Sequence, residues 1–499
     1  MRLFFKEKRM PRRAGTLMHI TSLPSEGGVG TLGEAAYRFV DFLHESGQSL
    51  WQMLPVGPTG FGGSPYQSAS AFAGDPLLID LPELVERKLL DAQEIPRTEG
   101  LHGNALRAAK EQALRASYAR CGEQARAQVE AFAAGHPWLA DWALFSALKA
   151  RYENAPWQQW PAEYARRDPA ALARLKKEAA QEIEYHAYVQ WLFARQWARL
   201  KRYAQERGVQ FIGDMPIYAS DDSADCWAHP ELFQLDEKGR PTHVAGVPPD
   251  CFSEDGQRWG NPLYNWPAMK AERYAWWVAR MRQTAERFDI VRIDHFIGFA
   301  NYYSIPAELP TARVGEWIKG PGRPLFARIE KELPGLQIIA EDLGVMSPRV
   351  KRLIRRCGYP GMRVLVFAFG SGDANPNLPE HYVENSVVYT GTHDNDTLAG
   401  TLAGADEVMA ADVARRFAGA DDLPGAMIGA LLQSRADTAI VPMQDWLRLG
   451  SEARMNMPGT VGDFNWTWRM APDAPTAEIA PRIRSEIEKA GRLAKEEKR

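Results

Sequence analysis

The sequence predicts an α/β fold: a (β/α)8 TIM barrel with a large helical insertion and extended loops around a candidate active site. Three observations predict it. Eight short runs rich in apolar and β-branched residues recur along the 499 residues. Helical patterns with a 3.6-residue period separate most of them. The runs are apolar throughout rather than alternating, which is typical of parallel strands covered on both faces.

The eight strands can be placed in order along the chain. We expect them at residues 15–20, 49–56, 209–217, 288–296, 336–343, 362–369, 386–394 and 438–444. Helices are expected after the first strand, at 32–46, and before the fourth, at 270–287. A further helix, at 347–357, has clear ends, because Ser347 can cap it, Pro348 suits its first turn and Gly358 stops it.

Two long segments interrupt the alternation of strands and helices. Residues 83–205 are rich in Ala, Arg, Glu and Gln and predict a mostly helical insertion between strands two and three. Residues 218–268 predict a loop insertion after strand three, beside the candidate active site. The remaining expectation is a single catalytic barrel over residues 13–499, preceded by an extension at 1–12. Met10 is an alternative start, so residues 1–9 could lie upstream of the native chain.

Composition argues against several classes of partner. The net charge of −3 gives no support for a nucleic-acid or membrane partner. The sequence contains no run of 18 apolar residues that could span a membrane. The apolar start, Leu3–Phe5, is too short for a signal peptide. Four cysteines without C-x-x-C spacing make a disulfide framework or structural zinc improbable and predict a cytoplasmic protein.

Ionisable residues end four of the eight predicted strands. They are Asp214, Arg292 with Asp294, Glu341 with Asp342, and His393 with Asp394. Reacting groups in such barrels lie at the carboxyl ends of the strands. A single carboxylate there is usually structural, but carboxylates from four strands on one rim shift one another's pKa and indicate chemistry.

The spacing of these residues suggests two different carboxyl groups. Arg292 and Asp294 are two residues apart on one strand, so they share a face, and the arginine would keep the aspartate ionised. Glu341 follows three apolar residues, and burial or a nearby carboxylate would raise its pKa. One ionised and one protonated carboxyl group are what glycoside cleavage requires.

Two other readings of the sequence are weaker. Asp294-His295 and His393-Asp394 could together ligate a metal, but metal-dependent hydrolase barrels usually carry an HxH pair on strand one, which here offers only His19. Residues 28–33 match GxGxxG, but they lie eight residues beyond their strand and the next strand ends without an acidic residue. We therefore expect neither a metal nor an organic cofactor.

Glycine-rich segments that mix aromatic and amide side chains suggest sugar binding. They lie at 62–68, 256–262 and 460–468. Aromatic planes suit the C–H faces of sugars, and amides suit their hydroxyls. Of the sixteen tryptophans, we expect Trp259 to contact ligand. Tryptophans expected to pack the core or the helical insertion are Trp138, Trp142, Trp157, Trp160, Trp191, Trp197, Trp276 and Trp277.

Eight motifs in one order carry a resemblance to a known family. They are GTLMHITSLPS (15–25), WQMLPVGPTGFGGSPYQS (51–68), GDMPIYAS (213–220), FSEDGQRWGNP (252–262), RIDHF (292–296), AEDLG (340–344), GTHDNDT (391–397) and NMPGT (456–460). Over about residues 13–470 the chain resembles the 4-α-glucanotransferases of the amylomaltase (disproportionating enzyme) family, relatives of the α-amylase clan.

The resemblance implies roles for individual residues. Asp294 would be the nucleophile, Glu341 the general acid/base, and Asp394 the third carboxylate, which stabilises the transition state. Arg292 would orient Asp294. The resemblance assigns substrate contacts to Tyr66, Asp214 and His393 at the transferred glucose, and to Gln257, Trp259 and Asn465 in loops over the glucan.

The resemblance also implies an activity. A retaining 4-α-glucanotransferase would move α-1,4-glucan segments from maltooligosaccharide or amylose donors to the 4-hydroxyl of glucose or a glucan by double displacement. Retention would place the two carboxyl groups about 5–5.5 Å apart. A long donor whose own end acts as acceptor would be cyclised. Two alternatives remain: an α-amylase-like retaining hydrolase, and a noncatalytic glucan-binding barrel.

Overall fold

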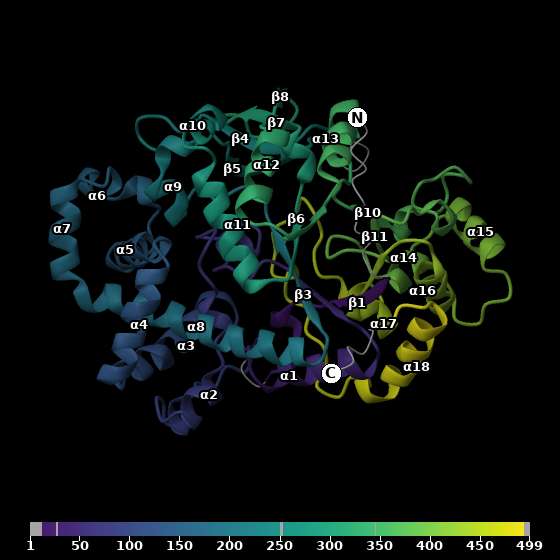
Figure 1. Ribbon diagram of the computed structural model, residues 1–499, viewed down its shortest axis with the longest axis horizontal. Helices are drawn as coiled ribbons and strands as arrows, with labels where there is room; N and C mark the ends of the chain where they lie inside the picture. The colour runs from purple at the N-terminus through teal and green to yellow at the C-terminus, as the bar shows by residue number, and fades with distance from the viewer. Residues whose placement is uncertain (1–11, 26–27, 250–252, 345, 494–499) are drawn as a thin grey trace.

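The computed structural model describes residues 12–25, 28–249, 253–344 and 346–493. A parallel sheet of eight strands forms its centre (Figure 1). In chain order the strands are β1 (Arg13–Leu17), β2 (Leu50–Met53), β3 (Gln210–Met215), β6 (Ile290–Ile293), β9 (Gln337–Ala340), β10 (Gly361–Val364), β11 (Ser386–Tyr389) and β12 (Thr438–Pro442). Each lies within or overlaps one of the eight predicted strands, so these predictions are confirmed.

The sheet curls into a nearly closed barrel. Its strand order is β10-β11-β12-β1-β2-β3-β6-β9, and the two outer strands meet. The Ala340 N–H donates to the Pro360 carbonyl at 2.9 Å, and the Met362 N–H donates to Asp342 Oδ1 at 2.7 Å. Buried apolar side chains such as Ile212, Ile339 and Ile440 fill the interior. The predicted (β/α)8 barrel is confirmed.

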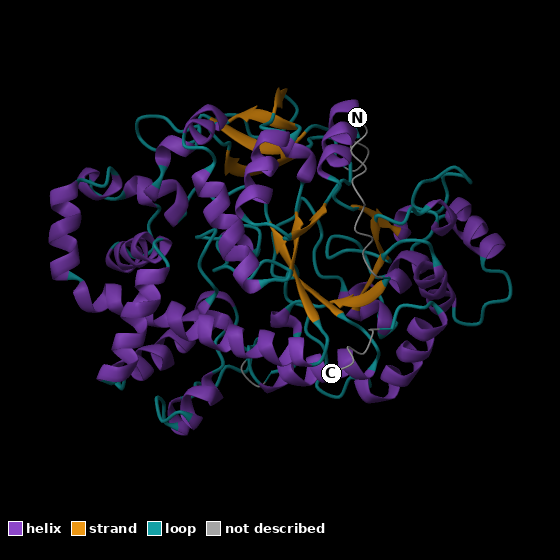
Figure 2. Ribbon diagram, viewed as in Figure 1, coloured by secondary structure: helices purple, strands orange, loops and turns teal. Residues whose placement is uncertain are grey.

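Helices surround the barrel (Figure 2). They include α1 (Glu34–Glu45), α11 (Ala275–Arg287), α12 (Arg323–Glu332), α13 (Pro348–Cys357), α14 (Leu398–Ala403), α15 (Glu407–Arg416), α16 (Leu423–Gln433), α17 (Met443–Trp446) and α18 (Thr476–Lys489). The ends of α13 are as predicted. Ser347 Oγ accepts a hydrogen bond from the Val350 N–H, and Gly358 ends the helix in the left-handed conformation at φ 71°.

Seven helices lie between β2 and β3, on one side of the barrel (Figure 1). They are α2 (Leu81–Glu86), α3 (Gly103–Ala119), α4 (Glu123–Gly135), α5 (Trp138–Arg151), α6 (Ala162–Ala165), α7 (Pro169–Glu178) and α8 (Ala180–Glu206). The 27-residue α8 joins them to the barrel, because Trp197 packs edge-on against Phe211 of β3 and against Phe288.

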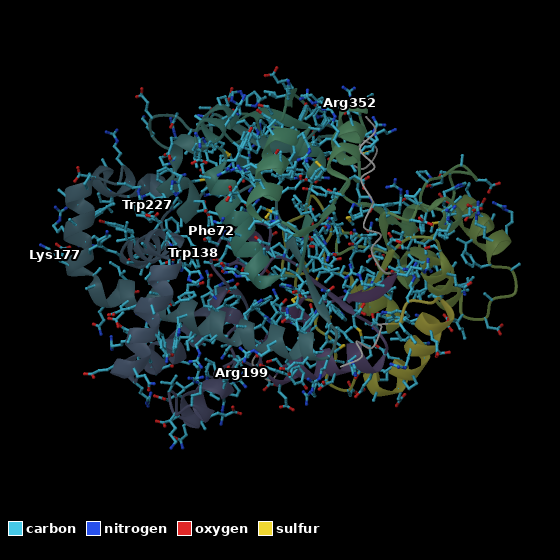
Figure 3. The ribbon with its side chains drawn as sticks, viewed as in Figure 1. Phe72, Trp138, Lys177, Arg199, Trp227 and Arg352 are labelled. Atoms are coloured by element: carbon cyan, nitrogen blue, oxygen red, sulfur yellow. The ribbon has the colours of Figure 1, made fainter. Side chains whose placement is uncertain are left out.

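The tryptophans expected in the core are buried. Trp191, Trp197, Trp276 and Trp277 are each 5% exposed or less. In the insertion, Trp142, Trp157 and Trp160 are also buried. Trp138 is half-buried and stacks on Phe72, with 6.1 Å between the ring centroids (Figure 3). The prediction that these rings pack the core and the insertion is confirmed.

Residues 218–268 are not one loop, as the sequence had suggested. They contain α9 (Ala224–Ala228), α10 (Trp266–Ala271) and two strands, β4 (His243–Val247) and β5 (Gln257–Pro262). These strands join β7 (Asn301–Pro306) and β8 (Glu316–Lys319) in an antiparallel sheet of order β5-β4-β7-β8. The prediction was wrong because β4 pairs with a strand on the far side of β6 in the sequence, and local patterns do not register such pairing.

Other expectations concern the ends of the chain and the membrane. Residues 1–11 of the expected extension, with Met10, lie outside the described residues. Arg12 is described, and its Nη1 donates to the Ser434 carbonyl at 2.8 Å. Among the described helices, none combines the length and the apolar character needed to cross a bilayer.

One arginine fastens the C-terminal segment beneath the barrel. Arg492 is fully buried, and its guanidinium donates to five backbone carbonyl groups at 2.5–3.2 Å. One of the five belongs to Arg13 of β1, and the others belong to Leu432, Ser434, Ala436 and Asp437, just before β12. The segment after α18 therefore holds the entry to two adjacent barrel strands.

Replacing Arg492 by Met should destabilise the barrel, because five hydrogen bonds to buried carbonyl groups are lost. Three of the five carbonyl groups keep another donor, from Arg12 or from the Arg13 N–H. We therefore expect the free energy of unfolding, measured by urea denaturation, to fall by about 3 kcal/mol, at about 1–3 kcal/mol for each group left unpaired. The control is Arg484→Met on α18, where an exposed side chain makes one 3.4 Å bond. A fall no larger than that of the control would contradict the assigned role.

Candidate active site

Three adjacent strands bring the predicted residues together at one rim. Asp214 on β3 pairs in register with Arg292 on β6. Ile293 of β6 pairs with Ala340 of β9, so the next residues, Asp294 and Glu341, follow side by side. Because alternate residues of a strand share a face, Arg292 and Asp294 point the same way. The register of these three strands therefore brings the four ionisable side chains together at the rim.

Arg292 lies at the centre of this group. Its Nη1 donates to both oxygens of Asp214 at 2.6 Å and to Asp294 Oδ1 at 3.0 Å. Arg292 and Asp214 are buried, whereas the Asp294 side chain is 29% exposed. Burial alone would lower the pKa of Arg292, but Asp214 and Asp294 outweigh it and hold that pKa well above its usual value. The guanidinium therefore stays charged beside Asp294.

Tyr66 and His393, two further residues predicted from the sequence, lie beside Asp214. The Tyr66 hydroxyl donates to Asp214 Oδ2 at 2.8 Å, and its ring stacks on that of His393 with 5.1 Å between centroids. Burial, followed by the charge of Asp214, raises the pKa of Tyr66 well above its usual value. Tyr66 therefore remains a neutral hydrogen-bond donor that ties His393 to the Asp214–Arg292 pair.

Glu341 has a different environment from Asp294. It is 6% exposed, and its two oxygens accept the backbone N–H groups of His295 at 2.8 Å and Leu343 at 2.5 Å. Those donors favour the ionised form, but burial and the charge of Asp294 outweigh them and raise the pKa of Glu341 to about 8. At neutral pH this carboxyl group can therefore hold a proton.

The backbone of His295, the residue after Asp294, helps to hold Glu341 in place. His295 adopts a left-handed backbone conformation at φ 48°, and its N–H donates to Glu341. Left-handed backbone is uncommon outside glycine and marks positions where local structure enforces a sharp turn. Here the turn directly after Asp294 aims a peptide donor at the neighbouring strand.

Asp394 is the most exposed of the three predicted catalytic carboxylates, at 46% of its side chain. Its Oδ1 accepts a 2.6 Å hydrogen bond from Asn456 Nδ2 and lies 3.4 Å from His393 Nε2. Its backbone carbonyl accepts Arg454 Nη2 at 2.8 Å. Sequence reasoning missed the positions of Asn456 and Arg454, although Asn456 begins the NMPGT motif, which was a usable signal.

The sequence-predicted Gln257 and Trp259 reach the site on β5. Trp259 is half-buried, and its ring lies edge-on to that of His295 with 4.8 Å between centroids. Its Nε1 donates to Gln257 Oε1 at 3.1 Å. Gln67, missed in the sequence although it lies in the PYQS motif, donates to the Trp259 carbonyl at 3.2 Å and to Asn261 Oδ1 at 3.0 Å. It therefore ties the 62–68 segment to β5.

The predicted glucan contact of Asn465 is the least supported by the geometry. Asn465 is buried; its Oδ1 accepts the Met457 N–H at 2.8 Å, and its Nδ2 donates to the Thr460 carbonyl at 3.1 Å. The side chain thus shapes its own loop, and a sugar contact stays a prediction. The ring centroid of the next residue, Trp466, lies 5.9 Å from those of Tyr66 and His393. Trp466 was not among the site residues predicted from the sequence.

The part of the chain that the structure describes contains no group of three or more His, Cys, Asp or Glu side chains placed to hold a metal ion. His295, one of the residues that the sequence offered as a metal ligand, packs its ring against Trp259. The chemistry that the arrangement itself offers is a pair of unequal carboxyl groups on adjacent strands, one beside a cation and one buried.

Comparison with known proteins places this geometry in a family. The glycoside hydrolase family 77 model, described as 4-alpha-glucanotransferase, matches residues 18–475. The 4-alpha-glucanotransferase of Thermus thermophilus is 47% identical over 97% of this chain and 100% of its own. That of Streptococcus pneumoniae is 43% identical over 94% of this chain and 95% of its own. The structure of Streptococcus agalactiae amylomaltase in complex with acarbose matches with a TM-score of 0.93 at 38% identity, over 97% of this chain and 100% of that one.

Replacing Arg292 by Met should destabilise the protein by about 3–5 kcal/mol at pH 7, because Asp214 would be left buried without its counter-charge. The pKa of Asp214 is already raised by burial. Without the guanidinium it would rise further above its unfolded value, and such a group costs stability as the pH rises through its folded pKa. The destabilisation should therefore shrink as the pH falls.

Urea denaturation at pH 7 and pH 5 measures this effect. The matched control is Arg363→Met on β10, whose half-buried guanidinium lies 3.6 Å from Asp342. We expect the control to lose far less stability. Equal losses for the two variants, or a loss for Arg292→Met that grows at acidic pH, would refute the assigned pairing.

Proposed function

The chain belongs to the 4-alpha-glucanotransferase family, and from this premise we propose how its barrel rim transfers glucan by double displacement. Its activity is that of a 4-alpha-glucanotransferase acting on α-1,4-glucans. The proposal concerns which side chains do the chemistry. It depends on one observation above all, the unequal settings of Asp294 and Glu341 on adjacent strands.

In the first step, the Asp294 carboxylate attacks the anomeric carbon of the donor sugar. The glycosidic bond breaks, and Glu341 gives its proton to the leaving oxygen. In the second step, Glu341 removes the proton from the 4-hydroxyl of an acceptor sugar, whose oxygen attacks the anomeric carbon. The ester bond to Asp294 breaks, and two inversions restore the α-1,4 linkage.

The charge of Asp294 explains how one residue can act first as acid and then as base. After burial, that charge is the largest cause that raises the pKa of Glu341. When Asp294 forms an ester with the sugar, its negative charge is lost, so the pKa of Glu341 falls. The residue then favours its ionised form, which is the form that the second step needs.

The surrounding residues take supporting roles in this proposal. Arg292 orients Asp294 through a hydrogen bond from its guanidinium. Asp394 binds hydroxyl groups of the donor sugar and stabilises its oxocarbenium-like transition state. Tyr66, Asp214 and His393 line the position of the transferred glucose, and Gln257, Trp259 and Asn465 belong to segments that cover the glucan.

We further propose maltooligosaccharides and amylose-type glucans as donors and glucose as an acceptor. An amylomaltase that is 38% identical to this chain has been solved in complex with acarbose, and we extend that class of ligand to this rim. Cyclisation follows when the free end of a long donor acts as acceptor. We place this carbohydrate metabolism in the cytoplasm, in keeping with four cysteines that form no C-x-x-C spacing. The α-amylase-like hydrolase is not favoured, given relatives at 43–47% identity named for transfer.

Incubation with maltotriose tests transfer directly. We expect glucose together with a ladder of oligosaccharides longer than the substrate, resolved by chromatography. Products that are only shorter than maltotriose would identify a hydrolase and refute the proposal. Asp294→Ala is the companion variant: it should keep the far-ultraviolet circular dichroism of the parent and form no products. Substantial turnover by that variant would remove Asp294 from the role of nucleophile.

The raised pKa of Glu341 predicts an alkaline limit to activity. Donor cleavage needs the protonated form, which is lost as the pH rises through about 8, so kcat/KM for maltotriose should fall about tenfold per unit above that pH. Glu341→Gln cannot donate a proton and should lose about 10²–10⁴-fold in turnover.

A donor that needs no protonation provides the control for this limit. With α-glucosyl fluoride, Glu341→Gln should lose far less in the first step, because fluoride departs without a proton. An alkaline limb near pH 5, or an equal loss with both donors, would show that Glu341 is not the acid.

A further inference from the structure

One buried side chain holds both ends of the loop that presents Asp394. The loop, residues 391–397, connects β11 to α14. On the side of β11, the Thr390 Oγ1 donates to Asp445 Oδ2 at 2.5 Å. On the side of α14, the Leu398 N–H donates to Asp445 Oδ1 at 2.7 Å. The two bonds join residues eight positions apart through a single carboxylate.

Asp445 itself lies outside the catalytic rim. It belongs to α17, the short helix that follows β12, and is 2% exposed. Its own backbone carbonyl accepts Arg448 Nη1 at 2.7 Å, and Arg448 also pairs with Asp422 at 2.9 Å. Arg448 therefore holds the backbone of Asp445, and Asp445 takes no part in the double displacement proposed above.

The segment that follows Asp445 makes further contacts with the same loop. Ser451 Oγ donates to Asp396 Oδ2 at 2.7 Å. Arg454 and Asn456 donate to the backbone carbonyl and to Oδ1 of Asp394, as described above. We call residues 443–456 the cradle. The cradle therefore contacts the loop itself and the residues on both sides of it. Asp445 makes the two flanking contacts, to Thr390 and Leu398.

The position of Asp445 favours a side chain with two hydrogen-bonding atoms. A hydroxyl and a peptide N–H converge on it, so an apolar replacement would leave both donors unpaired in a buried place. Burial raises the pKa of Asp445 to about 6, the two hydrogen bonds and Arg448 oppose that rise, and Asp396 adds to it. The alternative is that Asp445 caps α14 and contributes only to stability.

We propose that Asp445 is a positioning residue for glucan transfer, which fixes both ends of the 391–397 loop and thereby the place of Asp394. This inference rests on the proposed role of Asp394. A capping role affects how much protein is folded, whereas a positioning role affects turnover per folded molecule. Because Asp394 acts on the transition state in that proposal, Asp445 acts mainly on kcat and little on KM.

The test compares Asp445→Ala with Asp445→Asn by steady-state kinetics on maltotriose. The alanine leaves both donors unpaired, and we expect kcat to fall about 10–100-fold, the cost of a small misplacement of catalytic groups, while KM changes little. The amide oxygen of the asparagine can still accept the Leu398 N–H, and its NH2 can donate to Thr390. We expect Asp445→Asn to recover most of the lost kcat.

Asp406→Ala is the matched control. Asp406 is the N-cap of α15, where its Oδ1 accepts the Met409 N–H at 2.8 Å, and among the described residues no hydrogen bond joins it to the 391–397 loop. It should lower Tm without changing kcat. If Asp445→Ala also lowers only Tm, or if Asp445→Asn is as impaired as the alanine variant, the inference is overturned.

Two further measurements keep the test decisive. Should Asp445→Ala fail to fold, Thr390→Val removes only one arm, and we expect a several-fold loss of kcat; an unchanged kcat would count against the inference. Hydrogen–deuterium exchange of residues 391–397 reports the loop without reference to activity, and it should rise in Asp445→Ala. Faster exchange combined with full activity of Asp394→Asn would refute the proposed role of Asp394 while leaving the loop contact intact.

Discussion

A single buried cation organises the rim of this barrel. Arg292 is enclosed by β3, β6 and the side chain of Tyr66, and such a charge is tolerable only while its counter-charges stay in place. Asp214 supplies a buried counter-charge, and Asp294 supplies a partly exposed one. The reacting carboxylate is therefore the outer partner of the guanidinium, whose inner partner, Asp214, is buried, and the position of Asp294 follows from the packing of the strands.

The same constraint separates the two reacting carboxyl groups electrically. Asp294 accepts a hydrogen bond from the guanidinium, whereas Glu341, on the adjacent strand, is buried and accepts backbone N–H groups. Burial and the charge of Asp294 raise the pKa of Glu341 to about 8, although Arg292 opposes that rise. A difference in burial and in partners across one pair of strands is what makes the two carboxyl groups unequal.

Much of this could be predicted from the sequence, and the limits are physical. Buried parallel strands are apolar runs, and their carboxyl ends share one rim, so Asp214, Arg292, Asp294 and Glu341 could be brought together without coordinates. The antiparallel sheet could not be foreseen, because β4 pairs with β7 across an intervening barrel strand. Asn456 and Asp445 escaped notice for a related reason: which side chains after β12 contact Asp394 or the ends of its loop depends on how that part of the chain folds back. Asn465 shows the converse, since a polar side chain in a sugar-type motif turned out to brace its own loop.

The anchoring of Arg492 has a consequence for how the protein is made. Its guanidinium binds the carbonyl of Arg13 at the very start of the barrel, and β1 takes β12 as a neighbour. A ribosome releases these partners more than 400 residues apart, so the first strand emerges with one edge open and must wait for nearly the whole chain. Unpaired strand edges invite wrong pairing, and long-range closure is slow. Pairing of β1 with β12 is therefore a late event of biosynthesis.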